Sequence, residues 1–503
     1  MAVSSAAHAR TGGCDRVVQS KIAVAGGDGE ARARGRRPDR AMMVRRWLRF
    51  GAVGLVFGLA GCATYHPLPL PQQPNLASNL SQLKLTLPPQ KDGADPAKLD
   101  IAKPLTPDQV AMLAVLNDPE LASQRGKIDV AKADVLAAKI LPNPSVGLGD
   151  AFLVYAPPAA GAIADALTAS VSQDIQSIIT YGPRVAAAEA RFHQVGADAL
   201  WDEWQVAQKA RLLAIGLNGE DLEIALRQHD LALLTAEVKD VQQATAAGNL
   251  DLTAEAPLLA SLAGAQRDLA SLQLQEIKDW QELNSTLGLQ PNVRFVIAAP
   301  EPVKLPDTID PLVASLPQRR PDLVALKLGY DAAEADVRTA ILGQFPAFSL
   351  GAAGGSDTSE VVSVGPQITF DLPIFDRNQA KIALRSATRL QLHAEYQSRL
   401  DDAVAKARSL LVRARIAADN LARARTAAAS AESYLNAAER AYHQGNLDQR
   451  SLSDYQSTAL DREVDVLAYE QKLQEDALGL EVELGIGFPP TMIAPPDREE
   501  THS

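Results

Sequence analysis

Apolar residues along most of the chain recur with helical spacing, whereas four shorter stretches alternate with the period of β-strands. The longest helical stretch lies between Pro373 and Gly445, where residues 374–444 contain neither Gly nor Pro. A helix of that length would reach roughly 100 Å at about 1.5 Å per residue. Its many alanines mix with Leu and Arg, which predicts close, coiled-coil packing against other helices. A matching helix is expected from Pro183 to Gly248, with returning helices over about 251–288 and 448–485.

The four alternating stretches place apolar side chains on one face and small or polar side chains on the other. They are SVGLGDAFLVY from Ser145, AIADALTASVSQDI from Ala162, FPAFSLGAAGG from Phe345 and VVSVGPQITFDLPI from Val361. Strands of about 10–14 residues with one apolar face suit a transmembrane barrel. A half-buried sheet of a soluble protein is the alternative. Four strands cannot close a barrel, and lipid does not tolerate open edges, so other chains would have to complete it: two chains would give 8 strands and three would give 12.

The tetrapeptide GNLD occurs twice, at Gly248–Asp251 and Gly445–Asp448, 197 residues apart. Other segments match in the same order, including DPEL at Asp118–Leu121 and RPDL at Arg320–Leu323. A tandem duplication covering roughly 117–289 and 319–486 is the simplest account of this order.

Each GNLD segment is expected to connect an outgoing helix to a returning one. Gly can end the first helix because it adopts positive φ, and Asp favours the N-terminus of the next helix. Two interpretations of these turns are open. They are turns and helix caps only, or they also form a docking tip, in which Asp251 and Asp448 would add to a ring of carboxylates. The tip residues are Gly248, Asn249, Leu250 and Asp251 in the first turn and Tyr442, Gly445, Asn446, Leu447 and Asp448 in the second.

The N-terminal region resembles the signal peptide of a bacterial lipoprotein. Arg45, Arg46 and Arg49 precede an apolar run over 50–60, which is too short to cross a bilayer and reads as a signal-peptide core. The run ends in LAGC, which resembles a lipobox and predicts lipid attachment at Cys62. The residue directly after Cys62 is Ala63 and not Asp, so the resemblance to a lipobox implies that the protein is located in the outer membrane. An ordinary signal peptide with a chance cysteine is the alternative.

The sequence divides into six segments. They are a misplaced start or disordered leader (1–41), a lipoprotein signal peptide (42–61), an extended linker (62–104), a first repeat (105–300), a second repeat (301–488) and a polar tail (489–503).

Composition argues against catalysis and nucleic-acid binding. Residues 62–503 carry 57 acidic and 38 basic side chains, a net charge of −19, which disfavours nucleic acid as a partner. Cys62 is the only cysteine of this part, so no intrachain disulfide is expected. The chain has no zinc-protease helix motif, nucleophile elbow, P-loop or Cys/His cluster. We therefore expect no enzyme, no metal site and no cofactor apart from the lipid on Cys62.

The ordered set of motifs resembles the TolC family of outer-membrane efflux proteins, in its lipoprotein branch, over about 105–487. The set comprises the lipobox, the DPEL/RPDL helix, LPNPSVG before a strand, FDLPIFD before a long helix, and YHQGNLDQRSLSDYQ at the second turn. The resemblance departs at the first turn, where Thr245 stands three residues before Gly248 and Tyr442 stands three before Gly445. It therefore puts in doubt any contact that would use an aromatic in both tips.

The resemblance implies a mainly α, α+β fold: a long α-helical coiled-coil tunnel with four transmembrane strands per chain. A homotrimer would form a 12-stranded barrel in the outer membrane and would dock a periplasmic adaptor and an inner-membrane efflux pump. It implies passive export of drugs, metal ions or other small solutes. The rival class is a periplasmic coiled-coil lipoprotein that acts as an adaptor or scaffold, which would explain the helices but not the strands.

Overall fold

The computed structural model describes residues 65–86, 99–152, 154–155, 165–250, 253, 255–359 and 361–487. The chain divides into two units, Met1–Gln73 and Pro74–Ser503. The elements below belong to the second unit. Cys62 and Asp251 lie outside the described residues.

Two sets of elements follow each other in the same order, as the duplication predicts. The first set is α3 (Pro119–Lys139), β1 (Ser145–Ala151), β2 (Ala166–Asp174), α5 (Tyr181–Ala246) and α6 (Glu255–Leu287). The second is α9 (Pro321–Leu342), β3 (Phe348–Ser356), β4 (Val362–Phe370), α10 (Gln379–His443) and α11 (Gln449–Glu483). Shorter helices are η2 (Leu80–Gln82), α2 (Pro107–Asn117), α4 (Gln176–Ile179), α7 (Asp310–Ala314) and α8 (Leu316–Arg319). The segment boundaries proposed above remain predictions.

Local sequence explains where the shorter helices of each set begin. Thr106 and Gln109 form a capping box at the start of α2. The Asp118 carboxylate accepts the backbone N–H groups of Glu120 and Leu121 at the start of α3, and Pro119 occupies the first turn. In the RPDL copy Arg320 makes no cap and instead binds Asp322 through two hydrogen bonds, at 3.0 and 2.8 Å.

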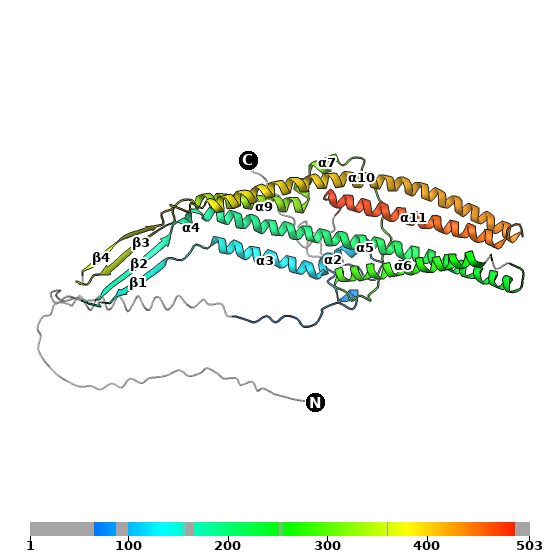
Figure 1. Ribbon diagram of the computed structural model, residues 1–503, viewed down its shortest axis with the longest axis horizontal. Helices are drawn as coiled ribbons and strands as arrows, with labels where there is room; N and C mark the ends of the chain where they lie inside the picture. The colour runs from blue at the N-terminus through cyan, green and yellow to red at the C-terminus, as the bar shows by residue number, and fades with distance from the viewer. Residues whose placement is uncertain are drawn as a thin grey trace, which may run out of the picture. The chain divides into compact units, whose positions relative to one another are not determined.

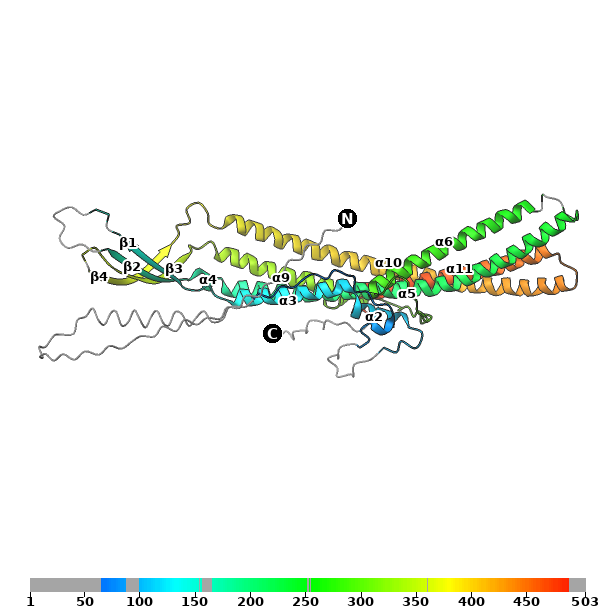
Figure 2. The ribbon, with the colours of Figure 1, turned by 90° about the horizontal axis from the view of Figure 1, so that it is seen from below.

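The helices form a layer with α5 at its centre. Helix α5 contacts α3, α6, α9 and α11, while α10 contacts α9 and α11. The outermost helices are therefore α10 on one side and α3 with α6 on the other (Figure 1). Figure 2 shows the strands at one end of the long helices of this unit and the α5–α6 and α10–α11 turns at the other.

Small apolar clusters hold the two hairpins at matching positions. Ala210, Leu283 and Leu287 are buried in one cluster, and Ala407, Leu480 and Leu484, each 197 residues later, are buried in another. Alanine at the α5 and α10 positions lets the helix axes approach closely. The clusters are thin, as a chain with only 5% aromatic residues predicts.

The four strands form one antiparallel sheet in the order β1-β2-β3-β4. The register pairs Val146 with Val171, Val171 with Ala352, and Ala352 with Pro366. The strands contain seven to nine residues, so the expected length of about 10–14 is wrong. One cause is that the Asp174 side chain accepts the Gln176 amide and turns the chain into α4. Phe152 and Val154 lie beyond the end of β1, and Leu372 lies beyond the end of β4.

Candidate functional site

One face of the sheet carries apolar side chains that no described residue covers. Val146, Leu148, Leu167, Val171, Leu350, Val362, Val364, Ile368 and Phe370 are all exposed. Leu148 and Val364 reach 82% and 80% exposure, which an apolar face of a soluble sheet does not show. The alternation predicted from the sequence is confirmed, and the exposure disfavours a half-buried soluble sheet.

The opposite face of the sheet is lined by small and polar side chains. In the observed register it presents Ser145, Gly147, Gly149, Ala166, Thr168, Ser170, Ser172, Ser349, Gly351, Ala353, Ser363, Gly365, Gln367 and Thr369. Asp150 lies on the apolar face, one residue before the end of β1 that is away from the helices. Strands β1 and β4 each have one edge without a partner strand in the described chain.

The two GNLD turns have the same backbone geometry. Gly248 and Gly445 both have φ of 75°. The amide of Gly248 donates to Thr245 O and that of Asn249 to Ala244 O, each at 2.9 Å. The amides of Gly445 and Asn446 make the equivalent bonds. These paired bonds are the Schellman motif, so the predicted role of both glycines is confirmed.

The leucine of the turn is more exposed in the first copy than in the second, whereas the asparagine is exposed in both. Leu250 is exposed and Leu447 is half-buried. The Asp448 carboxylate accepts the Ser451 amide at 2.7 Å and caps α11. This bond lowers the pKa of Asp448, as expected for a carboxylate that receives a backbone N–H. Capping by Asp448 is therefore observed, whereas its place in a carboxylate ring stays a prediction.

Polar contacts join the two hairpins between the turns and the middle of the helices. Arg227 of α5 pairs with Asp461 of α11 at 3.0 Å, and Ser457 donates to Asp230 at 3.1 Å. Nearer the turn, buried Glu237 hydrogen-bonds Ser453, and burial raises the pKa of Glu237. The contacts link repeat one to repeat two close to both turns.

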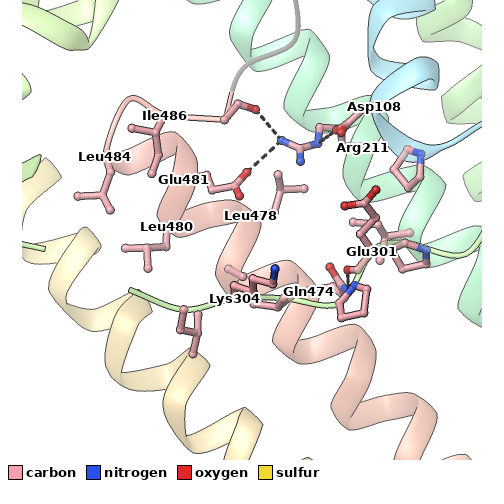
Figure 3. A pocket seen from close by; sticks show the side chains of 18 of the residues that line it. Asp108, Arg211, Glu301, Lys304, Gln474, Leu478, Leu480, Glu481, Leu484 and Ile486 are labelled. Carbon is pink, nitrogen blue, oxygen red and sulfur yellow. Dashed lines mark hydrogen bonds and ion pairs between the residues drawn. The ribbon is translucent and has the colours of Figure 1, made fainter. Parts of the chain in front are cut away.

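A polar cluster and a cavity of about 620 Å³ lie where the segment between the repeats crosses the helices. Arg211 of α5 lies between Asp108 of α2 and Glu481 of α11 (Figure 3). The Nε atom of Arg211 lies 2.7 Å from a carboxylate oxygen of Asp108; the two groups form an ion pair, but the N–H does not point at the oxygen as a hydrogen bond requires. The Nη1 atom of Arg211 lies 3.2 Å from a carboxylate oxygen of Glu481. Burial raises the pKa of Glu481, and Arg211 opposes that rise. The sequence gives no local signal for this cluster, because its members are separated by more than 100 residues.

The described residues contain no group of three or more His, Cys, Asp or Glu side chains that could hold a metal ion. Nor does any described helix combine the length and the apolar character needed to cross a membrane.

The comparisons with known proteins point to one family. Residues 312–485 match the family model described as outer membrane efflux protein. The comparison with curated protein sequences gives no match.

Solved structures share the fold over most of the chain. The Campylobacter jejuni CmeC outer membrane channel is 14% identical with a TM-score of 0.64, covering 85% of this chain and 96% of that chain. The outer-membrane channel OprN is 16% identical with a TM-score of 0.63, covering 85% and 100%. The outer membrane protein VceC of Vibrio cholerae is 17% identical with a TM-score of 0.60, covering 76% and 96%. Residues 312–485 therefore carry an outer membrane efflux protein domain, and the solved structures show that the chain shares the fold of outer-membrane channels over most of its length.

Proposed function

We propose that this protein is the outer-membrane channel subunit of a tripartite efflux system. Three copies would close a 12-stranded barrel in the outer membrane, and their helices would form a periplasmic tunnel. A periplasmic adaptor and an inner-membrane pump would deliver the solute and supply the energy. Lipid on Cys62 would add a second attachment to the outer membrane.

The observation that carries this proposal is the sheet, which has an exposed apolar face and two unpaired edges. Lipid can cover the apolar face, but no unpaired edge is stable in lipid. Neighbouring strands alternate in direction, so β4 of one copy would meet β1 of the next in antiparallel orientation. A ring of identical chains therefore satisfies both edges with one repeated contact.

The outermost helices offer apolar surfaces on the same two sides. On α10, Leu384, Leu390, Val412 and Ile416 are all more than half exposed. Val130 and Leu136 of α3 and Leu274 of α6 are equally open on the other side of the layer. Contact between these two sides in a ring would cover apolar area that is exposed in one chain.

An adaptor or scaffold lipoprotein is the second candidate. It would account for the long helices and for Cys62. It offers no environment for the apolar face of the sheet, so the observations favour the channel.

The sequence bears on the transported solute only through the kinds of metal-binding residue that it lacks. The absence of Met and His clusters in the sequence argues against a tight site for soft metal ions. A passive duct need not bind what it conducts, so drugs, metal ions and other small solutes are all compatible with the proposal.

The assembly is tested by native mass spectrometry of the full chain extracted from membranes in detergent. We expect three copies per particle. A stable monomer that retains its full strand content would contradict the barrel.

The turns are proposed to meet the adaptor at the periplasmic mouth. Replacing Leu250 and Leu447 with Asp should abolish crosslinking to the adaptor and efflux, because an apolar contact with the adaptor would be lost. Trimers should still form.

Asp448→Asn tests the carboxylate ring, because it keeps a capping side chain but removes its charge. Altered cation preference of single channels in Asp448→Asn would support a carboxylate ring. Unchanged efflux, crosslinking and ion preference in all variants would leave the two segments as turns only.

A further inference from the structure

The two hairpins of the sheet pair in the same register once the duplication is taken into account. Ser145 of β1 lies opposite Ser172 of β2, and Ser349 of β3 lies opposite Thr369 of β4. Each residue of β1 therefore corresponds to the residue of β3 204 positions later, and each residue of β2 to the residue of β4 197 positions later. The same offsets separate the segments PNPSVG and PAFSLG and the two GNLD turns.

Strands β2 and β3 join the first repeat to the second within one chain. In this junction Val171 lies opposite Ala352. In the proposed ring, β4 of one copy meets β1 of the next copy. Because β4 corresponds to β2 and β1 to β3, the same two repeat surfaces would meet at the junction between copies as inside the chain.

We propose that β4 of one copy pairs with β1 of the next copy in the register that β2 makes with β3. Moving Val171 forward by 197 positions and Ala352 back by 204 places Ile368 opposite Leu148 of the next copy. The inference rests on the proposed ring of copies and adds to it the residues that meet at each junction.

The proposed register keeps apolar side chains together on one face of the barrel. Ile368 lies opposite Leu148 of the next copy, and Phe370 lies opposite Val146 of the next copy. All four residues are more than half exposed in the single chain. Paired aromatic and β-branched side chains stabilise neighbouring antiparallel strands. A register shifted by one residue would instead place the apolar face of one strand beside the polar face of the other.

A glycine at a close approach of two strands supports this register independently. A Cβ at Gly351 of β3 would lie 2.9 Å from both Cα and Cβ of Ser172 of β2, so the two strands leave no room for a side chain there. The corresponding pair between copies is Thr369 with Gly147 of the next copy. The proposed junction therefore has a glycine at the position where the observed junction needs one.

A second close approach has its glycine on the opposite strand. A Cβ at Gly355 of β3 would lie 3.2 Å from Cα of Thr168 of β2. The corresponding pair between copies is Gly365 with Ala151 of the next copy. Within the single chain a Cβ at Gly365 would meet no atom within 4 Å, so packing inside the chain does not require glycine there. A neighbouring strand in the proposed register supplies that requirement.

Registers shifted by two residues are the competing arrangements, because they also keep the two faces of the sheet separate. They would place Ile368 opposite Val146 or Asp150 of the next copy. Neither shifted register repeats the observed junction between β2 and β3, and the second sets a carboxylate against an apolar side chain.

Disulfide formation between introduced cysteines distinguishes the proposed register from the shifted ones. Directly opposed residues have Cβ atoms about 4.5–5.5 Å apart and diagonal residues about 7–8 Å. A disulfide requires about 3.5–4.5 Å. After copper–phenanthroline oxidation of outer-membrane fractions, Ile368→Cys combined with Leu148→Cys should convert the monomer band into covalent dimers and trimers on non-reducing denaturing gels. Ile368→Cys combined with Val146→Cys or with Asp150→Cys should stay monomeric. Each single variant gives the background that Cys62 contributes.

The pair inside the chain is the matched control. Val171→Cys with Ala352→Cys should form a disulfide within one chain, which shows that the oxidant reaches this depth of the sheet. Every variant is also checked for trimers under reducing conditions by native mass spectrometry. Phe370→Cys with Val146→Cys tests the same register if the first pair prevents assembly.

The outcomes separate the register from the ring. Trimers without a link in either proposed pair, or links in a shifted pair alone, would overturn the register and leave the ring in place. Absence of both trimers and links, while the control disulfide within the chain still forms, would refute the ring and the register together.

Discussion

At the scale of single residues, the backbone conformation of four glycines determines where the helices of the two hairpins end. Gly288 and Gly485 end the returning helices with φ of 68° and 65°, and Gly248 and Gly445 end the outgoing ones with φ of 75°. All four sites use the same pair of backbone hydrogen bonds. The duplicated hairpins are therefore ended by one device that needs a residue tolerant of positive φ.

Substitution of Gly248 isolates that conformational requirement. A Cβ at Gly248 would meet no atom within 4 Å, so Gly248→Ala adds backbone strain but no clash. We expect the hairpin end to lose about 1 kcal/mol. Gly264→Ala makes the same chemical change inside α6, also without a contact within 4 Å, and should gain about 1 kcal/mol. Hydrogen exchange of α5 and α6 peptides measures both effects, and equal signs would contradict the role of φ.

The turn glycines could be predicted because their signal is local. The Arg211 cluster could not be predicted in the same way. It depends on the rotation and register of one helix against another, which small Ala side chains leave weakly specified. An acid on a helical surface looks the same in sequence whether it faces solvent or an arginine of a neighbouring helix.

At the scale of elements, the alternation of apolar with small or polar residues correctly predicted the four strands and their two faces. It did not predict where the strands end. The stretches alternate beyond the hydrogen-bonded ladder, so Phe152, Val154 and Leu372 continue the pattern without being in a strand. The reason is that alternation describes extended chain, whereas a strand also requires a neighbour. Residues 251, 252 and 254 lie outside the described part, so the start of the first returning helix is known only from Glu255 onwards.

The two faces of β4 give a matched test of which side meets lipid. Val364 and Ser363 are neighbours on opposite faces of β4, and both are exposed in the single chain. Val364→Arg should cost up to about 2–4 kcal/mol in the membrane and reduce assembled trimers. Ser363→Arg should assemble normally, because its side chain would face the aqueous lumen. Semi-native gels of outer-membrane fractions measure the trimers, and equal loss in both variants would argue against this orientation.

At the scale of the whole molecule, the sheet and the helix layer are both incomplete on the same two sides. The unpaired edge of β4 belongs to the repeat that contains α10, and that of β1 follows α3. A single lateral contact between copies would therefore serve the barrel and the tunnel together. In the proposed trimer, such coupling would make assembly cooperative, because neither the barrel nor the tunnel would close within one chain.

Lipid attachment would add a contact that the barrel does not provide. Cys62 precedes the linker, so an acyl anchor there would hold the N-terminus at the membrane before three chains meet. Cys62→Ser should abolish metabolic labelling with a radioactive fatty acid, because the thiol that accepts the lipid is gone. Cys14→Ser is the matched control, because Cys14 lies before the proposed signal peptide (42–61), and labelling should be unchanged. Chains that begin at Met42 should give the same mature mass and the same amount in the outer membrane. Fatty-acid labelling that survives in Cys62→Ser would show that Cys62 is not the site of lipid attachment. Failure of the chain that begins at Met42 to be exported would show that the first 41 residues are needed.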